Sequence, residues 1–448
     1  MSKPSLPEGV RDFSPEQVFK RNYLFDTIKD VFLKYGFLPI ETPSMEKLST
    51  LTGKYGEEGD RLLFKILNNG DFLAKANKEA LIDMNSGKLV SSIADRGLRY
   101  DLTVPFARYV VMHQNDIAFP FKRFQIQPVW RADRAQRGRY REFYQCDVDV
   151  IGSESLMCEA ELVRIYDEVF HKLGLNVVIK VNNRKILEGI AESVGAKAKF
   201  TDMTIAIDKL DKVGEEGVEK ELLGRGFDAA SVVKIMSVLG TKSLTELKDY
   251  LKDSEIGQKG IRELEDFHSY LDSSPLSNVV AFDITLARGL NYYTGCIFEV
   301  QSKDATMGSI GGGGRYDDLT GVFGMKGVSG VGVSLGAERI FDIMEELGKF
   351  PKAVKGQAEL IFLAFDAESH KFAFTVVTAL RKAGIRADIY PEAAKMQKQM
   401  TYANRRGFAY AAIIGENERL QGKIALKNME SGEQLLLSVD ELIQKFKH

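Results

Sequence analysis

Hydrophobic residues at helical spacing follow the first helix-start signal in the chain. Ser14 is typical of an N-cap, Pro15 of the first helical position, and Gln17 of the position whose side chain completes a capping box. Apolar side chains then recur every three or four residues over the following turns. The pattern predicts a long helix that ends near Lys34. A strand is expected over residues 37–43. Its prolines suit a sheet edge or an unpaired end.

From Phe121 the pattern changes to alternation. Residues 124–131 and 141–150 each carry apolar side chains at even positions, which predicts a hairpin with one apolar and one polar face. The polar face of the second strand holds Arg141, Phe143, Gln145, Asp147 and Asp149, and that of the first holds Gln125, Gln127 and Arg131. Such a face is equally typical of a strand exposed to solvent.

The loop that joins these two strands, residues 132–141, is rich in arginine. The planar guanidinium of arginine suits bidentate binding of phosphate or carboxylate groups. The loop is therefore a candidate for contact with a phosphorylated ligand.

The rest of the chain divides into segments with different patterns of polar and apolar residues. Residues 68–95 are polar and predict loops or a short excursion. Charged and apolar residues repeat at helical spacing over 183–273, which we interpret as an inserted helical domain. From Gly356 strands and helices alternate, which predicts a small α/β domain with a largely parallel sheet, joined through residues 347–352. The predicted boundaries are 1–182 and 274–350 for the two parts of a catalytic domain, 183–273 for the insertion and 356–448 for the last domain.

Composition adds mainly exclusions. The 448 residues carry a formal net charge of -2, so only local basic clusters could attract a polyanion. The three cysteines form no metal-binding spacing, and we expect neither disulfides nor structural zinc. The chain shows no signal-like start and no apolar run long enough to span a bilayer. A cytoplasmic protein without a membrane contact is expected.

Three further segments hold candidate chemistry. In residues 99–105, Asp101 and Thr103 stand two apart, on one side if the segment is extended. Arg288 precedes Tyr292 and Tyr293 around a turn, although tyrosines in strands often serve only as core packing.

A glycine-rich strand over residues 330–336 enters a helix, and Arg339 lies near the start of that helix. Taken alone, Arg339 could be an exposed salt-bridge residue, and Gly311 to Gly314 a flexible turn. A standard P-loop is excluded because GxxxxGK[ST] is missing.

Together these segments resemble the histidyl-tRNA synthetase family of class II aminoacyl-tRNA synthetases, over essentially the whole chain. Residues 121–152 look like the family's motif 2 and residues 330–340 like motif 3, while residues 37–46, with Pro43, resemble the dimer-forming motif 1. LARGLNYYTG at 286–295 resembles the histidine-specific signature, and SIGGGGRYDDL at 309–319 its glycine-rich companion.

The resemblance implies an α+β fold, with an antiparallel catalytic sheet and helices, an inserted helical domain and a C-terminal α/β anticodon-binding domain. It also implies that the enzyme joins histidine to ATP, with Mg²⁺, and transfers the histidyl group to the 3′ end of histidine tRNA, as a homodimer. Catalysis would then depend on alignment and charge neutralisation, without an enzyme nucleophile.

The resemblance also implies roles for individual residues, and it assigns no metal ligand. Arg131 and Arg288 are implied catalytic residues that contact both the histidine carboxylate and the α-phosphate. The implied ATP site contains Arg131, Phe143 and Arg339, with adenine between the last two. The implied histidine site contains Asp101, Thr103 and Gln145 at the α-ammonium group, Asp149 and Tyr293 at the imidazole, and Tyr292 in the pocket wall, together with Arg131 and Arg288.

Contacts with tRNA are the least specific expectation. Arg134 and Arg137 are candidates for the acceptor end, and Lys395, Lys398, Arg405 and Arg406 for the anticodon side, although basic clusters are commonly solvated surface. Asn291 stands where many family members have aspartate, and the motif 2 loop mixes features of two branches of the family.

The alternative is a synthetase-like regulatory subunit that senses histidine without forming an adenylate. It predicts loss of the ATP-site arginines and of the terminal domain, whereas Arg131, Arg288 and Arg339 are all present here.

Overall fold

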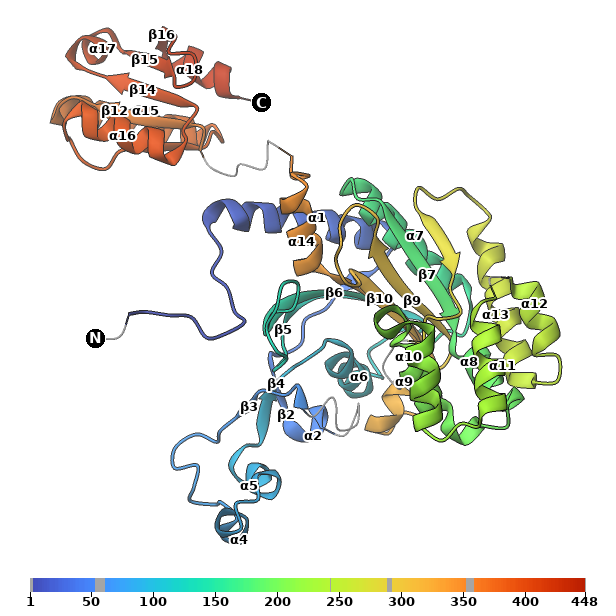
Figure 1. Cartoon of the computed structure of the whole chain (residues 1–448). Coiled ribbons are helices and arrows are strands. Elements are labelled where there is room, and N and C mark those ends of the chain that lie inside the picture. Colours follow the sequence, from blue (N-terminus) through green and yellow to red (C-terminus); the bar gives the residue numbers. More distant parts are fainter. Residues whose placement is uncertain (1–2, 53–60, 242, 288–291, 352–357, 448) are drawn as a thin grey trace. The chain divides into compact units, whose positions relative to one another are not determined.

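The computed structural model describes residues 3–52, 61–241, 243–287, 292–351 and 358–447. It divides into two compact units, Met1–Phe350 and Pro351–His448. The predicted α+β architecture, a large sheet with helices and a C-terminal domain with its own sheet, is confirmed (Figure 1).

The first unit is organised around an eight-stranded sheet. All neighbouring strands are antiparallel except the two edge pairs, β1–β5 and β7–β8, which are parallel. In order across the sheet the strands are β1 (Leu38–Pro39), β5 (Phe121–Trp130), β6 (Glu142–Ile151), β11 (Gly330–Gly336), β10 (Gly311–Tyr316), β9 (Cys296–Ser302), β7 (Val177–Asn183) and β8 (Val279–Phe282). The strand predicted over 37–43 is therefore present, but only two residues of it pair.

The first helix agrees with its sequence signals. Helix α1 spans Pro15–Lys34, and the Ser14 side chain accepts from the Gln17 backbone while the Gln17 side chain accepts from the Ser14 backbone. The capping box satisfies two N–H groups that the helix itself leaves unpaired. The apolar face of α1 then packs on the sheet, with Phe32 5.4 Å from Phe124 between ring centroids.

Two more helices complete the immediate support of the sheet. Helix α7 (Met157–Lys172) contacts α1 and β11, and α14 (Ala337–Glu346) directly continues β11 and contacts α1 and β6. A small three-stranded sheet of β2 (Met45–Lys47), β4 (Arg96–Leu98) and β3 (Lys65–Ile66) lies in the same unit, with α2 (Leu48–Leu51) and α6 (Thr103–Met112).

Residues 184–271 form the helices that the sequence predicts. They are α8 (Arg184–Ser193), η1 (Lys197–Lys199), α9 (Phe200–Ile207), α10 (Leu210–Gly224), α11 (Ala229–Leu239), α12 (Leu244–Tyr250) and α13 (Glu255–Leu271). Their buried side chains are continuous with the core of the large sheet, and Phe267 lies 5.9 Å from Phe298 of β9 between ring centroids. The boundaries of a separate inserted domain stay a prediction.

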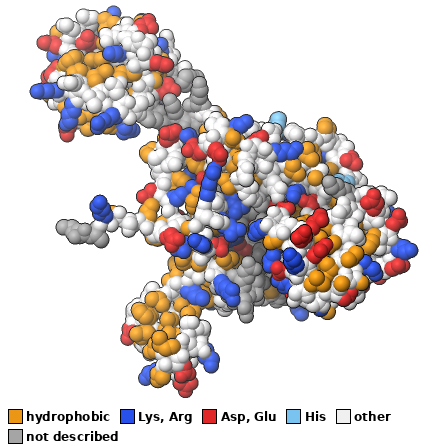
Figure 2. Space-filling model, in the orientation of Figure 1, with side chains coloured by type: hydrophobic (Ala, Val, Ile, Leu, Met, Phe, Trp, Pro, Cys, Tyr) orange, Lys and Arg blue, Asp and Glu red, His pale blue; other side chains and the backbone are white. Residues whose placement is uncertain are grey.

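Residues 68–95, predicted as loops or a short excursion, form an excursion between β3 and β4. It contains α4 (Lys78–Ile82) and α5 (Ser86–Ile93), each begun by an asparagine side chain, Asn77 and Asn85, that accepts a backbone N–H. Ile82 is 80% and Met84 86% exposed, and Figure 2 shows hydrophobic side chains gathered over this excursion. Helices this short lack the long apolar periodicity from which helices are predicted.

The second unit has a five-stranded sheet with helices on its faces. Across the sheet the order is β13 (Ala387–Ile389), β12 (Leu360–Ala364), β14 (Tyr410–Ile414), β15 (Lys423–Asn428) and β16 (Gln434–Ser438). The first three strands are parallel and the last two pairings are antiparallel. The helices are α15 (Ala367–Lys382), α16 (Met396–Arg406), α17 (Glu416–Gln421) and α18 (Val439–Phe446). None of the helices in the described part of the chain is long and apolar enough to cross a membrane.

One buried carboxylate joins four parts of the first unit. Glu338 of α14 accepts hydrogen bonds from both terminal nitrogens of Arg21 at 2.6 and 2.9 Å, from Arg11 at 2.5 Å and from the Tyr144 backbone at 3.3 Å. It thereby joins the N-terminal segment, α1, β6 and α14.

We expect Glu338→Gln to lower the free energy of unfolding by about 3 kcal/mol, because two arginines would lose their buried counter-charge. Urea unfolding followed by the fluorescence of Trp130, the chain's single tryptophan, measures this unit. As a control, Glu345→Gln breaks the more exposed pair with Lys20 and should cost less than about 1 kcal/mol. Equal losses in the two variants would contradict the prediction.

Candidate active site

The polar face of the β5–β6 hairpin is buried around Asp147 and Asp149 and partly buried toward the loop, so it is not a solvent-facing strand surface. The strand register places Gln125 opposite Asp147 and Arg123 opposite Asp149. Asp147 and Asp149 are each 3% exposed. Since burying an unpaired charge is costly, this face needs partners for its carboxylates.

Asp149 has two such partners from other strands of the sheet. Arg123 of β5 brings Nη2 to 2.7 Å from Asp149 Oδ2, and Tyr316 of β10 donates its hydroxyl to Oδ1 at 2.8 Å. Burial raises the pKa of Asp149, while the Arg123 cation and the Tyr316 hydrogen bond oppose that rise.

A glycine makes room for this carboxylate. Gly332 of β11 lies directly opposite Asp149, and a Cβ added there would lie 1.8 Å from Asp149 Oδ1. No side chain fits at that distance. The glycine at position 332 is thus explained by close approach of a charged group.

Asp147, one step along the same face, has a weaker set of partners. Burial raises the pKa of Asp147 to about 7, the Arg123 cation lowers it, and the Asp149 charge raises it further. Next to it, Gln145 donates Nε2 to Ser334 Oγ at 3.3 Å. Within the described residues the Asp147 Oδ1 and Gln145 Oε1 atoms have no hydrogen-bond partner, so this part of the face still offers polar atoms to a ligand.

The two signature tyrosines lie beside the Asp149 cluster. Tyr292 and Tyr293 have ring centroids 4.6 Å apart and hydroxyls 3.4 Å apart, and Tyr292 lies 6.2 Å from Tyr316. Burial raises the pKa of Tyr293, and the carboxylates of Asp149, Asp147 and Asp101 raise it too, so its hydroxyl keeps its proton and can donate.

The segment that carries Asp101 and Thr103 is not extended, which corrects the prediction. Thr103 is the first residue of α6, and the Asp101 side chain accepts the Val104 N–H at 3.3 Å. Pro105 does not prevent the helix, because a proline in the first turn lacks only an N–H that would be unpaired there. Asp101 is buried, and its negative charge raises the pKa of Tyr293 and of Asp147.

The predicted ATP residues lie at the other end of the hairpin. Arg131 donates Nε to the Tyr100 carbonyl at 2.9 Å, and its guanidinium lies 5.2 Å from the centre of the Phe143 ring. Arg339, in the first turn of α14, donates to the carbonyls of Gly138, at 2.8 Å, and Ser309. It therefore binds the arginine-rich loop, and it is partly buried and does not lie on an exposed face.

The candidate tRNA residues are all exposed. In the loop, Arg137 forms an ion pair with Glu346. In the second unit, Arg405 and Arg406 end α16, and Arg406 donates to the Tyr402 hydroxyl at 2.8 Å.

The two basic residues at the other end of α16 are Lys395, which precedes the helix, and Lys398, which pairs with Glu392 at 3.6 Å. Arg288 and Asn291 lie outside the described residues.

Comparison with known proteins identifies the family. A family model described as histidyl-tRNA synthetase matches residues 71–340, and one described as an anticodon binding domain matches residues 357–448. A histidine--tRNA ligase from Bacteroides fragilis is 56% identical over 447 residues, which cover 99% of this chain and 98% of the relative. The chain belongs to the histidyl-tRNA synthetase family. This confirms the prediction of a histidine-specific aminoacyl-tRNA synthetase.

Solved structures agree in fold. The histidyl-tRNA synthetase from Nostoc sp. PCC 7120 has a TM-score of 0.82 at 30% identity and covers 100% of this chain and 99% of its own. A Bacillus halodurans C chain described as an ATP phosphoribosyltransferase regulatory subunit/histidyl-tRNA synthetase has a TM-score of 0.72 at 22% identity, covering 92% of this chain and 99% of its own. That likeness concerns the fold alone.

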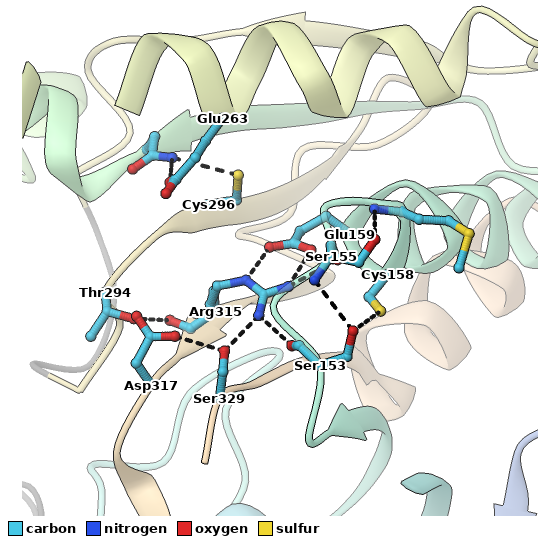
Figure 3. A network of polar contacts seen from close by, with 12 residues as sticks. Ser153, Ser155, Cys158, Glu159, Glu263, Thr294, Cys296, Arg315, Asp317 and Ser329 are labelled. Carbon is cyan, nitrogen blue, oxygen red and sulfur yellow. Dashed lines mark hydrogen bonds and ion pairs between the residues drawn. The ribbon is translucent and has the colours of Figure 1, made fainter. Parts of the chain in front are cut away.

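The sequence pattern did not single out several buried arginines of this synthetase. Arg315 of β10 pairs through Nε and Nη2 with both Glu159 oxygens, at 2.5 and 2.6 Å, and donates through Nη1 to Ser329 Oγ and the Ser153 carbonyl (Figure 3). It anchors the signature's glycine-rich companion to α7. Gly311 to Gly314 accordingly form a regular strand, not a flexible turn.

Arg123 was missed as well, although alternation along β5 extends to it. Its odd position puts it on the same face as Gln125 and Gln127, and that was the available signal. Arg99 is also buried, and it donates to Thr42 and Pro128 carbonyls and to Gln127.

The raised pKa of Asp147 predicts a pH effect on stability. A carboxyl whose pKa is higher folded than unfolded binds more protons in the native state, so its contribution to stability falls as pH rises from about 4 to 7. The difference in free energy of unfolding between Asp147→Asn and the unmodified protein should therefore be more favourable to the variant at pH 8 than at pH 5. We expect this change to be on the order of 2 kcal/mol.

Urea unfolding at the two pH values measures this difference. Asp253→Asn, at an exposed aspartate, serves as the control and should leave the pH dependence unchanged. The same change in both variants would show that Asp147 does not carry the buried proton.

Proposed function

We propose that this chain activates histidine with ATP, giving histidyl-adenylate and pyrophosphate, and then transfers the histidyl group to the 3′ end of histidine tRNA. The histidine carboxylate attacks the α-phosphorus, a P–O bond to pyrophosphate breaks, and no enzyme nucleophile takes part. The observation that carries the proposal is the buried polar face of β6, with Asp149 beside Tyr293 at one end and Phe143 beside Arg131 at the other.

The histidine pocket is proposed around Asp149. Asp149 and Tyr293 receive the imidazole and Tyr292 lines the pocket, while Asp101, Thr103 and Gln145 hold the α-ammonium group. The buried carboxyls of Asp101 and Asp147 support a cationic group there. A pocket built to pair with ring nitrogens leaves buried groups unpaired when another side chain enters, which can reject analogues by about 10⁴-fold.

ATP is proposed to bind along the arginine-rich loop. Arg131 and Arg288 act on the α-phosphate and the histidine carboxylate, as the catalytic residues. Phe143 and Arg339 hold adenine, and the contact of Arg339 with Gly138 brings that arginine to the loop.

Mg²⁺ is proposed to enter with ATP as part of the substrate. The described residues contain no group of three or more metal-ligating side chains. That suits an ion held largely by phosphates and water, as Mg²⁺ usually is in nucleotide sites.

The remaining partners are also proposals. We propose that residues 183–273 form an inserted domain and residues 356–448 the anticodon-binding domain, with Arg134 and Arg137 at the acceptor end and Arg405 and Arg406 at the anticodon. A homodimer through the motif 1 segment is supported by the edge position of β1, where Leu38 is 59% exposed. A cytoplasmic location stays a prediction from the sequence.

Exchange of labelled pyrophosphate into ATP tests the first step. We expect exchange that depends on histidine and that Arg288→Ala or Arg131→Ala reduces at least about 100-fold, because a cation at the developing phosphate charge is lost. Equal exchange with proline, threonine or glycine would refute the specificity. No exchange with any amino acid would favour the regulatory alternative.

Aminoacylation tests the tRNA contacts separately. The double variant Arg405→Ala/Arg406→Ala should raise KM for tRNA about tenfold and leave pyrophosphate exchange unchanged, since each cation lost at a phosphate weakens binding. Lys382→Ala, at an exposed basic residue of the same unit, is the control. An unchanged KM for tRNA in the double variant would contradict the proposal that these arginines contact the anticodon side of the tRNA.

A further inference from the structure

Arg123 is fully buried in β5, with 0% of its surface exposed. Its Nη2 lies 2.7 Å from Asp149 Oδ2, and its guanidinium lies 4.0 Å from the centre of the Phe106 ring in α6. Within the described residues, its nitrogens form no well-directed hydrogen bond, so Arg123 is held by one ion pair and by stacking.

Two other buried arginines of this unit, Arg315 and Arg99, behave differently. Arg315 pairs with Glu159 and also binds two backbone carbonyls, and Arg99 binds three backbone carbonyls and no carboxylate. Both tie chain segments together. Among the described residues, the ion pair of Arg123 is with one carboxylate, that of Asp149.

The Asp149 carboxylate is fixed through both of its oxygens. Arg123 forms the ion pair with Oδ2, and Tyr316 donates its hydroxyl to Oδ1. Gly332 leaves the space that the carboxylate occupies. Each carboxylate oxygen accepts about two hydrogen bonds, so each keeps capacity for a further N–H donor. The carboxylate thus has a set direction before any ligand arrives.

We propose that Arg123 is a positioning residue of the histidine site, which keeps Asp149 ionised and oriented so that its remaining lone pairs accept the imidazole N–H. The inference rests on the proposed role of Asp149 in binding the imidazole. Removing a buried counter-ion leaves the carboxylate to take up a proton or turn away, and in either case an acceptor for the ring is lost.

Arginine suits this position better than lysine. Its charge persists when buried and its planar group stacks on an aromatic ring, whereas a buried lysine readily loses its proton. Because Phe106 belongs to α6, the same contact also links the Asp149 pair to the helix that follows Asp101.

The test is a double-mutant cycle on the full chain, with KM for histidine and KM for ATP measured by pyrophosphate exchange. We expect Arg123→Gln to raise KM for histidine at least tenfold and to change KM for ATP less than twofold. Arg123→Lys should recover part of the loss. The inhibition constant of histidinol, which keeps the ring and lacks the carboxylate, should rise in parallel with KM for histidine.

The Asp149→Asn background separates the inference from the function on which it rests. If Arg123 acts through Asp149, Arg123→Gln adds less than a twofold change to Asp149→Asn. A full tenfold effect in that background, or an equal rise in KM for ATP, would overturn the positioning role. If Asp149→Asn leaves KM for histidine unchanged while histidine-dependent exchange persists, the assignment of Asp149 fails and the function stands.

Loss of fold is controlled by the unfolding midpoint read from Trp130. Where Arg123→Gln does not fold, the comparison of Arg123→Lys with the unmodified chain carries the test. A lysine variant with an unchanged stability and an unchanged KM for histidine and inhibition constant for histidinol would overturn the need for a planar, fixed cation.

Discussion

Burial of charge on the central sheet is the constraint on which the rest of the site depends. An isolated ion in a protein interior costs several kcal/mol, so each carboxylate there needs a partner close at hand. Asp149 has Arg123, Glu159 has Arg315 and Glu338 has Arg21. These pairs join strands, helices and the N-terminal segment into one framework before any substrate binds.

The same constraint explains why motifs far apart in the sequence meet. Asp149 lies in motif 2, Gly332 in motif 3 and Tyr316 in the glycine-rich companion, and the antiparallel register of β6, β11 and β10 brings them together. A preorganised carboxylate costs little to align when a ligand arrives, which is how such a site gains both affinity and selectivity. Rigidity of the sheet is thus part of the chemistry proposed for it.

Local features were predictable because their causes lie within a few residues. The capping box at Ser14 begins α1, and alternation identifies the β5–β6 hairpin, since both patterns depend on neighbours in sequence. One error has an equally local reason. The segment at Thr103 was expected to be extended but begins a helix that tolerates Pro105. Within the excursion over residues 68–95, helices α4 and α5 are too short to show a period.

By itself, the sequence determined the element types, the one polar face of the hairpin and, through its motifs, the family. Only the tertiary structure decided that this face is buried and which cation serves which carboxylate. The sequence spacing of Arg123 and Asp149 does not predict their contact, because the contact depends on the strand register and on the space left by Gly332. Ion pairs between strands depend on distances in three dimensions, which a pattern along one strand does not contain.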